Sequence, residues 1–157
     1  MTNSAEHDTP GVLAPPPVIY LPALLLGLVL DAVWPIGFVH GLLRYLLGGG
    51  LILVSGLIMP FVVRGFRRAR TSISFTKPST AIITTGPFRY SRNPAYVALT
   101  LLWVGLGVVL DNPWILVLLL PAVLLVHFGV VRREEHYLER RFGEEYRRYK
   151  ASVRRWL

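Results

Sequence analysis

Long runs of apolar residues alternate with polar segments along this chain of 157 residues. Four such runs predict helices, at residues 18–38, 45–63, 95–110 and 114–131. A helix needs about 20 apolar residues to cross the roughly 30 Å of hydrocarbon in a bilayer. The first two runs reach this length, and the third, which is shorter, is expected to cross with little tilt. The pattern predicts an all-α, polytopic membrane helix bundle with about four transmembrane helices.

The segments between and around these runs are polar. Residues 1–17 are rich in proline and polar side chains, which predicts a disordered tail. Residues 64–94 form a loop between the second and third runs, and residues 132–150 predict an amphipathic helix. From residue 138 to residue 156, apolar side chains recur at intervals of three and four, which places them on one helical face; they are Leu138, Phe142, Tyr146, Tyr149, Val153 and Trp156. Residues 18–157 are therefore expected to form a single membrane domain.

The basic residues are concentrated in two of these segments. The net charge is +8, and all but one of the 17 Lys and Arg residues lie in 64–94 or after Val131. Basic loops stay in the cytoplasm, so the loop at 64–94 and both termini are predicted to be cytoplasmic. The charges then face anionic lipid headgroups, and nucleic-acid binding is not expected.

The chain contains no cysteine, which excludes disulfides, thiolate zinc sites and a cysteine nucleophile; no metal site is expected. Asp31 and His127 are the only acidic or basic residues within the apolar runs, too few for an ion path, so a transporter or channel is disfavoured. Asp31 is interpreted as a helix-pairing or interfacial residue. His127 is either a site residue or a packing histidine bonded to a neighbouring backbone.

Candidate chemistry lies where the third run begins. Asn93 precedes Pro94, which predicts an N-cap followed by the first residue of a helix. The free N–H groups of a helix start favour an anion, and Arg92 adjoins them. A carboxylate or phosphate site is one interpretation; the other is a capped helix start whose arginine extends to headgroups.

Two acids follow the fourth run. Glu134 and Glu135 would face anionic lipid unless a cation holds them, and that cation is either Arg132 and Arg133 or a ligand. An amphipathic helix lying on the membrane is the simpler interpretation of this segment. Because both polar segments flank the same ends of the helices, we expect Glu134 to lie within about 15 Å of Arg92, the rise of ten helical residues.

Two separated motifs resemble those of a known superfamily. The first is Gly86-Pro87-Phe88 followed by Arg92-Asn93-Pro94-Ala95-Tyr96; the second is Glu134-Glu135 with Leu138, Phe142-Gly143, Tyr146 and Tyr149. Together, over about residues 80–155, they resemble the isoprenylcysteine carboxyl methyltransferase and phospholipid methyltransferase superfamily of integral-membrane enzymes. Asn93 stands where the family commonly has His, a form that resembles bacterial members and implies a bacterial inner membrane.

The resemblance implies S-adenosylmethionine as cofactor. Arg92, Asn93 and Pro94 would suit its carboxylate, and Glu134 or Glu135 its ammonium or ribose hydroxyls. The aromatic side chains would cover adenine and face the sulfonium; they are Tyr90, Tyr96, Tyr146 and Tyr149. An amine or alcohol acceptor would need a base, for which Glu135 or His127 would serve.

The acceptor implied by the resemblance is lipophilic and enters sideways from the bilayer. An isoprenylcysteine-like carboxylate or a related lipid is the first expectation. The alternatives are a phospholipid or small-molecule N- or S-methyltransferase of the same superfamily, and a non-enzymatic membrane module that binds anionic lipid. The oligomeric state stays open.

Overall fold

The computed structural model describes residues 9–71 and 78–157. The elements, in chain order, are α1 (Pro16–Val33), α2 (Leu42–Arg68), a 3-10 helix (Gly86–Arg89), α3 (Pro94–Val109), α4 (Pro113–Val126), a π-helix (His127–Val131), α5 (Arg132–Phe142) and α6 (Glu144–Ser152). No strand occurs in these described ranges, which confirms the all-α class.

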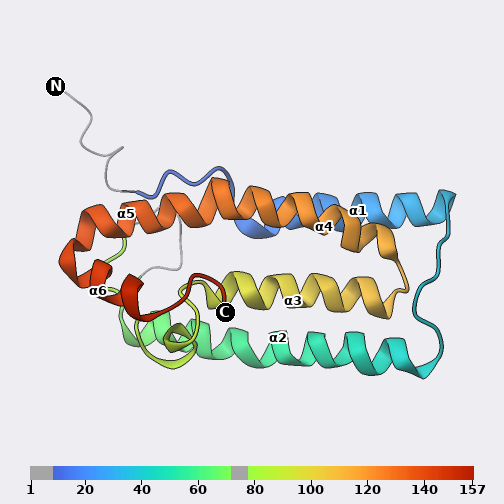
Figure 1. The fold of residues 1–157 in the computed structure, drawn as a ribbon, viewed down its shortest axis with the longest axis horizontal. Coiled ribbons are helices and arrows are strands. Elements are labelled where there is room, and N and C mark those ends of the chain that lie inside the picture. The colour runs from blue at the N-terminus through green and yellow to red at the C-terminus, as the bar shows by residue number, and fades with distance from the viewer. Residues whose placement is uncertain (1–8, 72–77) are drawn as a thin grey trace.

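The long helices lie side by side in two layers (Figure 1). One layer pairs α1 with α4, and the other pairs α2 with α3; α3 also packs on α4 and joins the layers. Beyond the end of the bundle, α5 continues from α4, and α6 turns back so that the C-terminus lies near the start of α3. The described parts of the polar segments 9–17, 64–94 and 132–150 are thereby gathered at one end of the molecule.

Within the described ranges, three helices are long and apolar enough to cross a membrane. They are α1 with 18 residues, α2 with 27, and the continuous helix Pro113–Phe142 with 30. The fourth, α3, has 16 residues and packs along α2. Thirty helical residues span about 45 Å, more than the hydrocarbon thickness, so the charged α5 extends beyond the bilayer. The membrane helix bundle predicted from the apolar runs is confirmed.

Glycines set the closest helix contacts. A Cβ atom added to Gly48 would lie 2.6 Å from the carbonyl oxygen of Gly105, and one on Gly105 would lie 2.8 Å from that of Gly48. A Cβ on Gly27 of α1 would lie 2.6 Å from Ile115 of α4. Small residues let membrane helices approach at such distances, where dispersion contacts hold each layer together.

Two helices differ in extent from the apolar runs that predicted them. α1 ends at Val33, earlier than residue 38, because the backbone turns there and the N–H groups of Phe38 and Val39 donate to the carboxylate of Asp111. α2 runs on to Arg68, past residue 63. An apolar run indicates only the part of a helix that lies in hydrocarbon. A helix extends beyond that part into water as long as its backbone hydrogen bonds continue.

The terminal segments also differ from expectation. The predicted helix at 132–150 breaks at Gly143, whose φ of 54° is left-handed, so its apolar residues do not share one face. Of the predicted disordered tail, residues 1–8 lie outside the described residues. Leu13 N–H donates to the carbonyl of Gly129, and Arg133 donates to that of Gly11, so residues 9–15 lie against the π-helix and α5.

Candidate functional site

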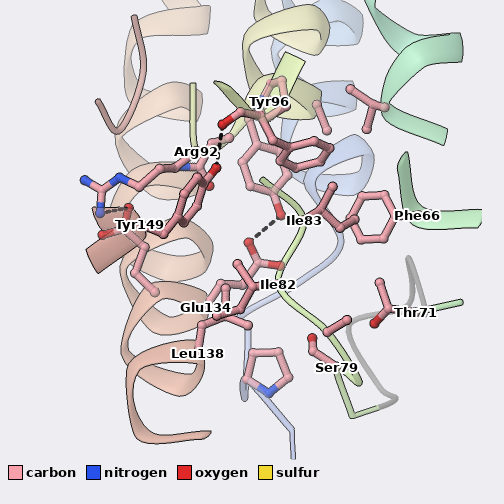
Figure 2. A pocket seen from close by; sticks show the side chains of 18 of the residues that line it. Phe66, Thr71, Ser79, Ile82, Ile83, Arg92, Tyr96, Glu134, Leu138 and Tyr149 are labelled. Carbon is pink, nitrogen blue, oxygen red and sulfur yellow. Dashed lines mark hydrogen bonds and ion pairs between the residues drawn. The ribbon is translucent and has the colours of Figure 1, made fainter. Parts of the chain in front are cut away.

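A cavity of about 180 Å³ lies where α2 ends and α3 begins. Five parts of the described chain surround it: the end of α2 with Thr71, the segment 79–96, α5, α6, and Pro10 of the N-terminal segment (Figure 2). Apolar side chains form most of its wall; they include Met59, Val62, Val63, Phe66, Ile82, Ile83, Phe88 and Leu138. The polar side chains that line it come mainly from the two motifs found in the sequence.

Glu134 and Tyr96 meet inside this cavity. The Tyr96 hydroxyl donates a hydrogen bond of 2.8 Å to Oε2 of Glu134, and both side chains are labelled in Figure 2. Burial raises the pKa of the Glu134 carboxyl to about 7; the bond from Tyr96 opposes this shift, and the charge of Glu135 adds to it. Glu134 therefore divides between its neutral and charged forms near pH 7 and favours the charged form when a cation is close.

Glu135 lies beside it but is bound by two arginines. Nε of Arg155 lies 3.1 Å from each carboxylate oxygen, and Nη2 of Arg155 lies 2.8 Å from Oε2. Nη1 of Arg92 lies 3.3 Å from Oε1. Because two guanidinium groups share one carboxylate, this cluster carries an excess of one positive charge. Arg92 and Glu135 keep only 9% and 6% of their side-chain area exposed.

Arg92 retains unused hydrogen-bond donors. Its buried Nε has no hydrogen-bond partner among the described residues, and its buried Nη1 forms the 3.3 Å ion pair with Glu135 but no hydrogen bond. A buried donor without a partner costs about 1–3 kcal/mol. An acceptor oxygen from a ligand would remove that cost and neutralise the excess charge. The cluster of Arg92, Glu135 and Arg155 thus suits a carboxylate or another anion.

Asn93 occupies the N-cap position of α3, as predicted, but its side chain does not cap the helix. Its Nδ2 donates to the carbonyl oxygen of Arg155 at 3.0 Å. Asn112, before α4, instead accepts from Ile115 N–H in the expected way. The C-terminal segment passes beside Asn93, and its carbonyl oxygen orients the Asn93 side chain through the amide nitrogen. Pro94 is the first residue of α3 and lines the cavity.

The predicted aromatic residues separate into two groups. Tyr96, Tyr146 and Tyr149 line the cavity. Tyr149 donates to the carbonyl oxygen of Phe88 at 2.8 Å, which holds α6 against the 3-10 helix. Burial raises the pKa of Tyr146 and Tyr149, so both phenols stay neutral at pH 7. Tyr90 is 76% exposed and does not line the cavity.

His127 also lies outside the cavity lining. Its Nδ1 accepts a hydrogen bond from Nε1 of Trp156, and the two rings stack with centroids 5.9 Å apart. A continuous α-helix would place His127 and Glu134, seven residues apart, on one helical face. The π-helix at His127–Val131 adds about one residue to the turn, which rotates the following helix by roughly 100° and separates the two faces.

Sequence reasoning missed Arg155 as well as the wall provided by α2. The spacing of residues 138–156 did indicate a helix, but only the turn at Gly143 brings Arg155 to Glu135. Tyr137 was missed too: it is buried, lines the cavity and accepts a hydrogen bond from Ser79 N–H. Its place beside Glu134 and Glu135 in the sequence was the available signal.

Comparisons with known proteins agree with the two motifs. The sequence model of a family described as phospholipid methyltransferase matches residues 43–145. An uncharacterized protein of Haemophilus influenzae is 57% identical over 35 residues, which cover 22% of this chain and 56% of that protein. The nickel-cobalt-cadmium resistance protein NccN of Alcaligenes xylosoxydans xylosoxydans is 37% identical over 68 residues, 43% of this chain and 32% of that one. The matched parts thus span about half and a third of these two relatives. No solved structure matches.

Proposed function

This chain belongs to the phospholipid methyltransferase family, and on that premise we propose that it transfers a methyl group from S-adenosylmethionine to a lipophilic acceptor. One observation carries the proposal. A largely apolar cavity is lined both by the cationic cluster around Arg92 and by Glu134, whose carboxyl has a pKa of about 7. When bound, S-adenosylmethionine supplies a methyl group on a sulfonium, which is a good leaving group. The protein then has mainly to position the cofactor and the acceptor, to exclude water from them and to accept a proton where the acceptor has to lose one.

The amino-acid end of S-adenosylmethionine carries one carboxylate and one ammonium. The excess positive charge of Arg92, Glu135 and Arg155 fits the carboxylate, and the buried donors of Arg92 would gain an acceptor. Glu134 fits the ammonium, because a nearby cation stabilises its charged form. Tyr96 holds the carboxylate of Glu134 in place through its hydroxyl.

The apolar wall supports a lipophilic acceptor. Met59, Val62 and Phe66 project from the end of α2, a helix long enough to cross the bilayer. A lipid tail would follow the surface of that helix and bring its polar head to the cavity. A lipophilic acceptor partitions into the bilayer, so it can reach a site in an integral-membrane protein without passing through water.

The acceptor head decides whether a base is needed. An isoprenylcysteine-like carboxylate attacks without losing a proton, whereas a lipid amine must first lose one. In this arrangement neither acid is free for that transfer, because Glu134 pairs with the ammonium of the cofactor and both oxygens of Glu135 are engaged by arginines. The arrangement therefore supports the carboxylate acceptor, which needs no base. His127 and Tyr90, which do not line the cavity, have no role in this proposal.

Binding of S-adenosylhomocysteine, the demethylated product, tests the proposal directly. Calorimetric titration of the purified protein in detergent should give micromolar affinity. E134Q should weaken binding by about tenfold or more, the effect of one charge-assisted hydrogen bond. E145Q, an exposed acid on α6, serves as the matched control and should change affinity by less than about twofold.

Activity completes the test. Labelled S-adenosylmethionine should transfer its methyl group to a component of a lipid extract, and identification of that product distinguishes carboxylate from amine acceptors. A wild-type protein that binds no S-adenosylhomocysteine and labels no lipid would favour the non-enzymatic module that binds anionic lipid.

A further inference from the structure

We propose that Arg155 is a positioning residue that keeps the Arg92 guanidinium available for the anionic end of the cofactor. This inference rests on the proposed function and concerns a residue outside both sequence motifs. Arg155 does not line the cavity, so it acts through Glu135 and not on the ligand itself.

The two arginines compete for Glu135 unequally. Arg155 makes three contacts of 2.8 to 3.1 Å with both carboxylate oxygens. Arg92 makes one ion-pair contact of 3.3 Å through Nη1, which forms no hydrogen bond, and its buried Nε has no partner among the described residues. Without Arg155, the carboxylate would be free to turn both oxygens to Arg92 and satisfy it. Arg155 thus prevents Glu135 from neutralising the group that the ligand needs.

The backbone of the same segment fixes the other side of Arg92. The carbonyl oxygen of Arg154 accepts from Arg92 N–H at 2.9 Å, and that of Arg155 accepts from Asn93 Nδ2 at 3.0 Å and from Ser91 Oγ at 3.3 Å. These bonds use main-chain atoms, which persist when a side chain is replaced. A substitution at position 155 therefore removes the contact with Glu135 while the turn at 91–93 stays anchored.

Further anchoring comes from Trp156, which stacks on His127 and donates a hydrogen bond to it. Arg154 provides a matched control because it carries the same charge on the neighbouring residue and is exposed. A change in overall charge would affect both positions alike, whereas the proposed contact exists only at Arg155.

The experiment compares two ligands on wild type, R155Q, R155K and R154Q. S-adenosylhomocysteine carries the carboxylate, and its decarboxylated form, S-adenosyl-3-thiopropylamine, lacks it but keeps the ammonium. Wild type should prefer the first ligand. R155Q should lose about tenfold in affinity for S-adenosylhomocysteine, the equivalent of one charge-assisted hydrogen bond, and less than about twofold for the decarboxylated form.

R155K, which keeps the charge but cannot form the forked contact, should lie between wild type and R155Q. R154Q should keep the wild-type ratio of the two affinities. Three results would each overturn the positioning role. They are equal losses of affinity for both ligands in R155Q, a wild-type ratio of the two affinities in both R155Q and R155K, and a change of this ratio in R154Q as large as that in R155Q. If R155Q does not fold, the ratio in R155K decides. Wild-type protein that binds neither ligand would instead refute the proposed function on which this inference rests.

Discussion

The Tyr96 hydroxyl and the Glu134 carboxylate, 38 residues apart in the sequence, form a 2.8 Å hydrogen bond that joins the first turn of α3 to α5. This bond links the two sequence motifs at the cavity and influences the pKa of the Glu134 carboxyl. A donor to the carboxylate favours its charged form, while burial favours its neutral form, and burial has the larger effect. Glu134 is consequently tuned to change charge close to physiological pH.

We expect the affinity for S-adenosylhomocysteine to rise with pH up to about 7 and then to level off. The pKa of Glu134 is raised from 4.5 to about 7, so the carboxyl is neutral below that range and charged above it. Only the charged form holds the ammonium of the ligand. Titrations between pH 5.5 and 8.5 test this, and E134Q should show a flat profile. Unliganded wild type should lose stability over the same rise in pH, since the buried carboxyl then has to ionise.

The Y96F substitution should move this pH profile upward. It removes the donor that stabilises the charged carboxylate, a bond worth about 1.5–3 kcal/mol, or about one to two pH units. The exposed Tyr90 provides the control, and Y90F should leave the profile in place. A profile that stays unmoved in Y96F would show that Tyr96 does not govern the charge of Glu134.

The two adjacent acids should respond differently to replacement by glutamine. E135Q leaves Arg92 buried without its counter-charge and also frees Arg155, so we expect a lower free energy of unfolding. The loss should fall below the roughly 3–5 kcal/mol of a fully buried pair because Arg155 is partly exposed. E134Q removes no ion pair and should keep stability near that of wild type. Thermal unfolding in detergent, measured together with the binding titration, distinguishes the two variants. Equal destabilisation by E134Q and E135Q would contradict the ion pairs assigned to Glu135.

Much of the arrangement was predictable from the sequence. Apolar runs report which helix segments face hydrocarbon, and this signal identified the bundle. The proximity of Arg92 to the Glu134-Glu135 pair was also predicted, and the 3.3 Å contact between Arg92 and Glu135 confirms it. Complementary charges at one end of a bundle have few other partners, which is why sequence position alone was informative here.

Other features depend on geometry that residue spacing does not encode. The π-helix at His127–Val131 turned His127 away from the face of Glu134, although seven residues of α-helix would have aligned them. Gly143 folded the C-terminal segment back, which brought Arg155 to the site and placed its carbonyl oxygen against the side-chain amide of Asn93. Tyr90 lies within the first motif yet is exposed, since only every third or fourth residue of a helical turn faces one side.

Neighbouring glycines of α2 should differ sharply in their tolerance of alanine. The Cβ of G48A would lie 2.6 Å from backbone and side-chain atoms of α3, whereas that of G49A would have nothing within 4 Å. Overpacking of this kind costs about 1–3 kcal/mol. G49A should change stability by less than about 0.5 kcal/mol. Thermal unfolding of the two variants provides the comparison, and equal midpoints would contradict the close contact of α2 with α3.

Both termini should lie in the cytoplasm. The described N-terminal residues contact the π-helix and α5, through Leu13 with Gly129 and Gly11 with Arg133, so both ends of the chain share one end of the bundle. The basic residues at 64–71, at 78–94 and after Val131 gather at that end, and the positive-inside rule assigns it to the cytoplasm. A reporter that is active only outside the cytoplasm should stay silent when fused after Leu157. The same reporter inserted after Asp111, in the short connection at the opposite end, should be active. The reverse pattern would invert the topology and place the cavity on the outer face, away from cytoplasmic S-adenosylmethionine.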